Sequence, residues 1–86
     1  MYKKEKEVFN QRIYQTLVKP WVDARKKAGI TQKKLAELSG IPQEAISRYE
    51  HGSYYPSGKS LLRIADALNL QIKFKGVRAS KQTKKK

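Results

Sequence analysis

Two short helical patterns lie next to each other near the middle of the chain, and their spacing constrains the fold more than any other feature. Thr31 is a good N-cap for a helix over residues 32–39, and Gly40 follows at the C-cap position. We expect a second helix from Pro42, whose missing N–H costs little in a first turn, to Glu50. A connection this short forces the two helices to cross closely.

The residues at the expected crossing have the sizes that such a contact needs. Ala36 is small enough to let the second helix approach, Gly40 permits the sharp turn, and Ile46 can plug the crossing from the other helix. Two short helices joined by a glycine-containing turn are the requirement for a helix-turn-helix. The run from Thr31 to Gly52 therefore predicts this motif.

The segment before the motif, residues 4–28, has a helical period but contains a proline. Proline inside a helix costs about 3 kcal/mol unless it lies in the first turn. Either one long helix is kinked near Lys19, or a new helix starts at Pro20; we prefer two helices. We expect Gly29 to end the segment, and its apolar residues fall four apart: Phe9, Ile13, Leu17 and Trp21. Trp21 is expected to serve only in packing.

After the motif, the pattern predicts one more helix and then a change of period. Ser57 can cap a helix from about Gly58 to Asn69, whose buried side we expect to consist of Leu61, Leu62, Ile64, Ala65 and Leu68. Apolar and polar residues alternate from Leu70 to Lys75, which is typical of a strand, and Gly76 ends it. Because a lone strand is not stable, we expect it to pair, for example with a second copy.

These elements predict an all-α fold, a compact bundle of four to five helices with a helix-turn-helix, plus one short C-terminal β-strand used in dimerisation. We divide the chain into an N-terminal helical extension (1–18), a helix-turn-helix DNA-binding domain (19–69), a β-strand dimerisation element (70–76) and a basic tail (77–86). We expect the tail to be disordered without a ligand, either merely solvated or a non-specific DNA arm.

Charge limits the choice of partner. The chain has 20 Lys and Arg against 7 Asp and Glu, a formal net charge of +13. Such an excess predicts a polyanionic partner such as DNA, RNA, an anionic membrane or an acidic protein. The absence of cysteine excludes a disulfide framework and a thiolate zinc site. No apolar run approaches the roughly 18 residues that cross a bilayer, and no signal-peptide pattern is seen, so we expect a cytoplasmic protein without a membrane partner.

The residues of the predicted helix-turn-helix also carry a family resemblance. The run from Ile30 to Gly52 closely resembles the XRE family of Cro-like and phage-repressor-like helix-turn-helix proteins. Pro56 and the run from Leu61 to Leu68 extend the resemblance to more than half of the chain. Pro42 departs from the family, which usually has a hydroxyl cap before the second helix of the motif. The layout, with extra helix ahead of the domain and a strand after it, is similar to antitoxins of the HigA and HipB type.

The resemblance implies base contacts from the exposed side of the second motif helix, made by Gln43, Glu44, Ser47 and Arg48. Gln can bond adenine bidentately and Arg can bond guanine in the same way. Gln43 could also be an ordinary exposed residue, and Arg48 a phosphate clamp only. Glu44 either accepts a hydrogen bond from a cytosine amine or is merely tolerated near DNA.

The resemblance also implies contacts with the DNA backbone, and these are assigned to Thr31, Gln32, Lys33, His51, Ser53 and Tyr54. Gln32 would both bond a phosphate and brace the second motif helix. Arg25 and Glu50 resemble a family ion pair that ties the first helix of the domain to the end of the second motif helix. If partly buried, this pair would favour one structure more than it would add stability.

We therefore expect a repressor-type transcriptional regulator that binds an operator in double-stranded DNA as a homodimer, with half-sites about 34 Å apart. The alternative is the antitoxin of a type II toxin–antitoxin pair, which binds a toxin protein and silences its own operon. A basic antitoxin is less natural for a basic ribonuclease toxin.

An enzyme is not expected, because the chain has one His, no Cys and no clustered carboxylates, and we expect no cofactor and no metal. RNA binding is not favoured, because the aromatic stacking pattern of single-strand readers is missing.

Overall fold

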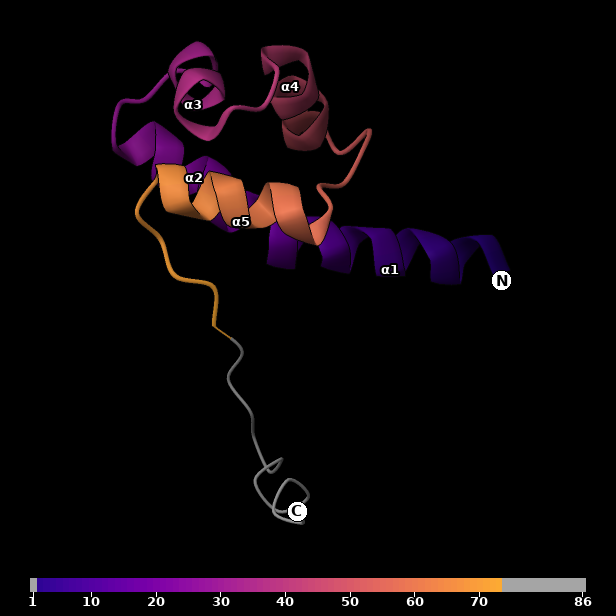
Figure 1. Cartoon of the computed structure of the whole chain (residues 1–86). Coiled ribbons are helices and arrows are strands. Elements are labelled where there is room, and N and C mark those ends of the chain that lie inside the picture. The colour runs from indigo at the N-terminus through magenta and orange to yellow at the C-terminus, as the bar shows by residue number, and fades with distance from the viewer. Residues whose placement is uncertain (1, 74–86) are drawn as a thin grey trace.

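Five helices follow one another along residues 2–73, the part of the chain that this computed structural model describes, with side chains described from residue 10. They are α1 (Tyr2–Leu17), α2 (Lys19–Lys27), α3 (Gln32–Ser39), α4 (Gln43–His51) and α5 (Gly58–Ala67). Figure 1 shows α3 and α4 beside each other on one side of α2 and α5, while α1 extends away from this group toward the N-terminus. The all-α prediction is confirmed for the described residues.

The proline before the motif separates two helices, as predicted. α1 ends at Leu17, and Pro20 lies in the first turn of α2, where its ring displaces no helical hydrogen bond. The Val18 N–H donates to the Tyr14 carbonyl at 2.9 Å, so the hydrogen bonding of α1 continues to the residue between the two helices. Arg25 lies in the last turn of α2 with two lysines, where positive charge is favoured by the helix dipole.

Hydroxyl caps begin two of the helices at the residues that the sequence indicates. Thr31 Oγ1 accepts a hydrogen bond from the Lys34 N–H at 3.0 Å, and Ser57 Oγ accepts one from the Ser60 N–H at 3.1 Å. Gly40 ends α3 at φ +76°, a left-handed conformation that residues with a Cβ rarely adopt. Both ends of α3 and the start of α5 are therefore set largely by local chemistry.

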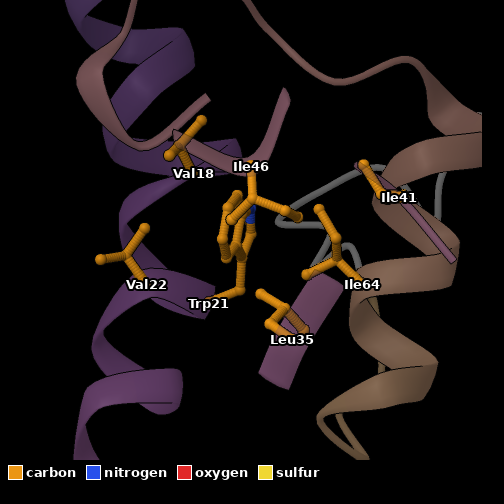
Figure 2. Packing of buried hydrophobic residues seen from close by; sticks show 7 residues of the cluster. All are labelled: Val18, Trp21, Val22, Leu35, Ile41, Ile46 and Ile64. Carbon is orange, nitrogen blue, oxygen red and sulfur yellow. The ribbon is translucent and has the colours of Figure 1, made fainter. Parts of the chain in front are cut away.

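The core lies where the last four helices meet. Its buried apolar side chains come from every one of these helices and from the joints around them, and they are Val18, Trp21, Val22, Leu35, Ile41, Ile46 and Ile64 (Figure 2). Trp21 is 3% exposed and its indole N–H donates to the Leu17 carbonyl at 2.9 Å, which confirms its packing role. Full burial of one such side chain contributes about 1.5–3 kcal/mol.

Near α5, one prediction is wrong and a second is not supported. Leu62 is 54% exposed, because the core-facing stripe of α5 runs through Leu61, Ile64 and Leu68, and Leu62 lies outside it. Residues 70–73 form no strand, since nothing in residues 2–73 offers a strand with which they could pair. The rest of the expected strand, residues 74–76, and the basic tail, residues 77–86, lie outside the described residues. Each helix within residues 2–73 is too short or too polar to cross a membrane.

Candidate nucleic-acid interface

α3 and α4 form the predicted helix-turn-helix, and their crossing is filled by apolar side chains. Leu35 on α3 and Ile46 on α4 are both fully buried, and Ala36 packs half-buried against the same cluster. The turn between the helices is tied by Ser39, whose Oγ accepts from the Ile41 N–H at 3.2 Å. The angle between the two helices is therefore fixed from both the core and the turn.

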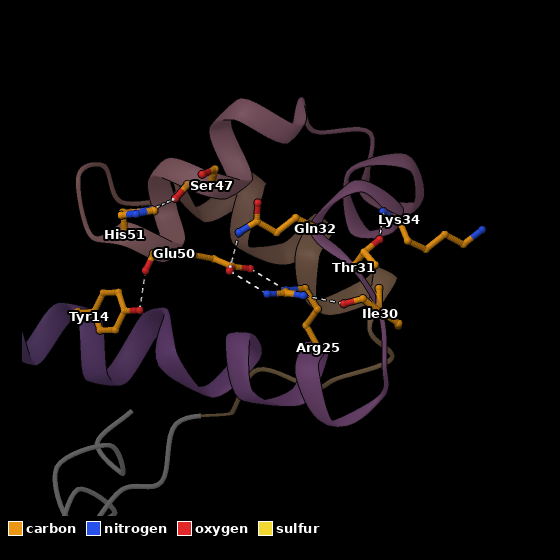
Figure 3. A network of polar contacts seen from close by, with 9 residues as sticks. All are labelled: Tyr14, Arg25, Ile30, Thr31, Gln32, Lys34, Ser47, Glu50 and His51. Carbon is orange, nitrogen blue, oxygen red and sulfur yellow. Dashed lines mark hydrogen bonds and ion pairs between the residues drawn. The ribbon is translucent and has the colours of Figure 1, made fainter.

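An ion pair ties the end of α4 to α2. Arg25 Nε donates to Glu50 Oε2 at 2.7 Å, and Arg25 Nη2 donates to Glu50 Oε1 at 2.9 Å (Figure 3). Both side chains are less than one-tenth exposed. Arg25 Nη1 also donates to the Ile30 carbonyl at 2.7 Å, so one guanidinium holds α4 and the segment before α3 together. Bidentate geometry of this kind fixes orientation as well as distance.

Gln32 joins the same network from α3. Its Nε2 donates to Glu50 Oε1 at 2.9 Å, so the Glu50 carboxylate accepts from both α2 and α3. Within the described side chains, no buried polar atom lacks a hydrogen-bond partner. When all the hydrogen bonds of a buried ion pair are made, its burial costs little folding free energy. Other arrangements of the helices are disfavoured because they would leave the charges unpaired. The structure thus shows Gln32 bracing α4.

The side of α4 that faces away from the core carries the residues assigned to base contacts. Gln43, Glu44 and Arg48 are exposed, and Ser47 is half-buried one turn after Gln43. The Arg48 guanidinium carbon lies 5.7 Å from the centre of the Tyr54 ring, within the range of a cation–π contact. These polar side chains share one side of α4, and the opposite side of the helix is held rigidly by the core. The arrangement is suited to placing the helix in a groove of a nucleic acid.

The residues assigned to backbone contacts surround this helix. Five of them are exposed and Gln32 is half-buried; the exposed ones are Thr31, Lys33, His51, Ser53 and Tyr54. His51 Nδ1 lies 3.1 Å from the Ser47 carbonyl oxygen, which fixes the ring near the end of α4. Among the residues that the structure describes, no three His, Cys, Asp or Glu side chains gather as metal ligands would.

Two tyrosines outside the residues assigned to DNA contacts connect α1 to this region, and the sequence pattern gives no sign of the first of them, Tyr14. The Tyr14 hydroxyl donates to the Glu50 carbonyl at 2.7 Å, and the Tyr55 hydroxyl donates to the Asn10 carbonyl at 3.5 Å. Tyr14 and Glu50 are 36 positions apart. No local pattern could have revealed this contact, because it depends on how α1 lies against the rest of the fold.

Comparison with known proteins agrees with this geometry. The family model described as Helix-turn-helix matches residues 23–74. The chain is 35% identical over 60 residues to an "Uncharacterized HTH-type transcriptional regulator" of Haemophilus influenzae, a match that covers 70% of this chain and 61% of that protein. It is 38% identical over 50 residues to the "ImmF control region 10 kDa protein" of Bacillus phage phi105, which covers 58% of this chain and 56% of that protein.

In both cases the matched segment spans less than two-thirds of the relative's length. The comparison with solved structures found no match to the chain. The family match covers α3, α4, α5 and most of α2, whereas α1 lies entirely outside it. The chain belongs to the XRE-type helix-turn-helix family.

Proposed function

We propose that this chain is a transcriptional regulator that recognises a DNA sequence by placing α4 in the major groove. The observation that carries the proposal is the contrast between the two sides of α4. One side is fixed by Ile46 in the core and by Glu50 in the buried ion pair, while the other exposes Gln43 and Arg48. A helix that reads bases needs both rigid support and accessible polar side chains. Family membership and the similarity to an HTH-type transcriptional regulator of Haemophilus influenzae support the same function.

In this function the four side chains of α4 that are assigned to base contacts have distinct roles. Gln43 reads adenine and Arg48 reads guanine, each through a bidentate hydrogen bond. Glu44 accepts from a cytosine amine, and Ser47 adds a shorter contact between them. The flanking residues bond phosphates, with Lys33 also supplying charge, and they are Thr31, Gln32, Lys33, His51, Ser53 and Tyr54. Phosphate contacts position the protein and base contacts determine the sequence that it prefers.

We further propose that the protein acts as a repressor and binds its operator as a homodimer. A single short helix makes few base contacts, and two copies on half-sites about 34 Å apart double them. Apolar side chains on α5 and just after it offer surface for the second copy: Leu62 is 54% exposed, Leu70 36% and Ile72 43%. The size of the complex on DNA with one or two half-sites tests this, and a monomer on both would contradict it.

The test of sequence recognition begins with selection of bound duplexes from a random pool. Dissociation constants are then measured for the selected duplex and for a scrambled duplex at physiological salt. We expect the selected duplex to bind on the order of a thousandfold more tightly, the lower end of the range for specific DNA-binding proteins. Equal affinities would show that the charge of the chain, and not α4, determines DNA binding.

A second candidate function, the antitoxin of a type II toxin–antitoxin pair, adds a protein partner to DNA binding. It is supported by an apolar groove of about 280 Å³ beside α1, α2 and α5, lined in part by Leu17, Trp21 and Leu61. Leu70 and Ile72 also line this groove, so a toxin would occupy part of the surface offered above to the second copy. Apolar grooves of this kind take up side chains of partner proteins. The test is co-expression with the product of the adjacent gene. A stable complex that suppresses a toxic activity supports this function, and a neighbour that neither binds nor is toxic argues against it.

A further inference from the structure

The C-terminal end of α4 has carbonyl groups that the helix itself cannot satisfy. The loop that follows supplies two of the partners: the Ser53 N–H donates to the Arg48 carbonyl at 3.0 Å, and the Gly52 N–H donates to the Tyr49 carbonyl at 3.0 Å. The Glu50 carbonyl instead accepts the hydroxyl of Tyr14 at 2.7 Å. A residue of α1 therefore completes the end of the helix that carries the base contacts.

The Tyr14 ring also lies against the turn that ends α4. Gly52 has φ +82°, and a Cβ placed there would lie 3.5 Å from Tyr14 Cδ2. Three positions further along, the Tyr55 hydroxyl donates to the Asn10 carbonyl of α1 at 3.5 Å. α1 thus contacts the segment from Glu50 to Tyr55 near both of its ends.

Between those contacts lies the part of the loop that holds Arg48. The N–H groups of Ser53 and Tyr54 both point to the Arg48 carbonyl, at 3.0 Å and 3.4 Å. The centre of the Tyr54 ring lies 5.7 Å from the guanidinium carbon of Arg48. The direction of the Arg48 side chain therefore depends on how firmly the loop is held at its two ends.

We propose that Tyr14 is a positioning residue for DNA recognition, through which α1 holds the end of α4 and the loop 52–55 so that Arg48 is aimed at its base. This inference rests on the proposed function of α4 in sequence recognition. Tyr14 touches no DNA in this role. Its loss lets the helix end and the loop move, which weakens a bidentate base contact but leaves the charge that attracts phosphates unchanged.

A purely structural role for Tyr14 makes a different prediction. If Tyr14 only stabilised the fold, its variants would lower the melting temperature, and the folded fraction would discriminate between DNA sequences as well as before. Tyr14→Phe separates the two roles, because it keeps the ring against Gly52 and removes only the hydroxyl that bonds Glu50.

The experiment compares the full chain with Tyr14→Phe, Tyr14→Ala and, as a matched control on α1, Gln15→Ala, whose side chain is exposed. Binding to the selected duplex and to a scrambled duplex is measured below the melting temperature of each protein. We expect Tyr14→Phe to weaken binding to the selected duplex about fivefold, the lower end of what one bidentate base contact contributes, with no change for the scrambled duplex. Tyr14→Ala should weaken binding to the selected duplex at least as much. Gln15→Ala should change the affinity for neither the selected nor the scrambled duplex.

Amide NMR spectra provide a readout that needs no DNA. We expect Tyr14→Phe to shift the signals of residues 48–55 more than those of residues 32–39. Unchanged discrimination, an equal loss on both duplexes, or shifts no larger at residues 48–55 than at residues 32–39 would each overturn the inference. If the wild-type chain prefers no sequence, the proposed function fails as well, and the NMR comparison still decides whether Tyr14 orders the loop.

Discussion

α4 and α1 differ in what holds them in place. α4 has 9 residues, yet it is fixed by the fully buried Ile46, by the Arg25–Glu50 ion pair and by the glycine turn that ends it. α1 has 16 residues, and from residue 10 to its end none of its side chains is fully buried. Short helices are marginal alone, so the position of a helix depends on tertiary contacts and not on its length.

The difference separates two kinds of substitution. Changes at the anchors of α4 remove buried contacts, so they should lower the stability of the whole domain. Changes in α1 remove contacts that are half-buried or exposed, so they should cost less free energy. The following predictions test this contrast.

The largest effect should come from the buried ion pair. Glu50→Ala leaves the Arg25 guanidinium buried without its carboxylate and also removes the acceptor of Gln32. We expect a loss of about 4 kcal/mol in the free energy of unfolding, measured by urea denaturation. The double variant Arg25→Leu/Glu50→Leu should recover much of this loss, because it leaves no unpaired charge. A loss below about 1 kcal/mol for Glu50→Ala would show that the pair does not anchor α4.

The next effect should come from the helix crossing. Ile46→Ala leaves a cavity between α3 and α4, and we expect it to cost about 3 kcal/mol by the same measurement. The control is Ile13→Ala, the same change on α1, where the side chain is half-buried and the loss should be about 1 kcal/mol. Equal losses at the two positions would remove the distinction between α4 and α1.

A smaller effect is expected at the start of α3. Thr31→Ala removes the hydroxyl that accepts from the Lys34 N–H, and it should lower the free energy of unfolding by about 1 kcal/mol. Ser57→Ala at α5 should have a similar effect, because its cap has the same geometry. A variant as stable as the wild type in thermal unfolding would mean that packing alone determines where these helices begin.

The smallest effect should come from an exposed ion pair at the start of α2. Lys19 Nζ lies 3.1 Å from Asp23 Oδ2, and the two side chains are 49% and 60% exposed. Lys19→Ala should change the free energy of unfolding by no more than about 0.5 kcal/mol, and less at high salt. A loss comparable to that of Glu50→Ala would contradict the view that burial gives the Arg25 pair its importance.

Much of the domain could be predicted from the sequence, because its signals are local. Thr31 and Gly40 mark both ends of α3 within one residue, and Pro20 separates α1 from α2. Ala36 and Ile46 are found at the crossing because their sizes suit it. The exposed side of α4 also follows from the helical period, once the buried Ile46 is placed.

What could not be predicted depends on contacts between distant segments. Leu62 is apolar like its neighbours on α5, and only the packed core shows that it lies outside the buried stripe. The alternation after Leu70 suggests a strand, but alternation alone supplies no partner. Tyr14 is one of five tyrosines, and nothing in its neighbourhood along the chain relates it to Glu50.

The claim that α4 reads DNA sequence is tested most directly by comparing base preferences. Duplexes are selected from a random pool with the wild-type chain, with Gln43→Ala and, as a control that removes one charge beside α4, with Lys33→Ala. The proposed function predicts that Gln43→Ala loses the preference at one base-pair position and keeps the others, whereas Lys33→Ala weakens binding to all sequences alike. Identical base preferences for the wild type and Gln43→Ala would contradict it.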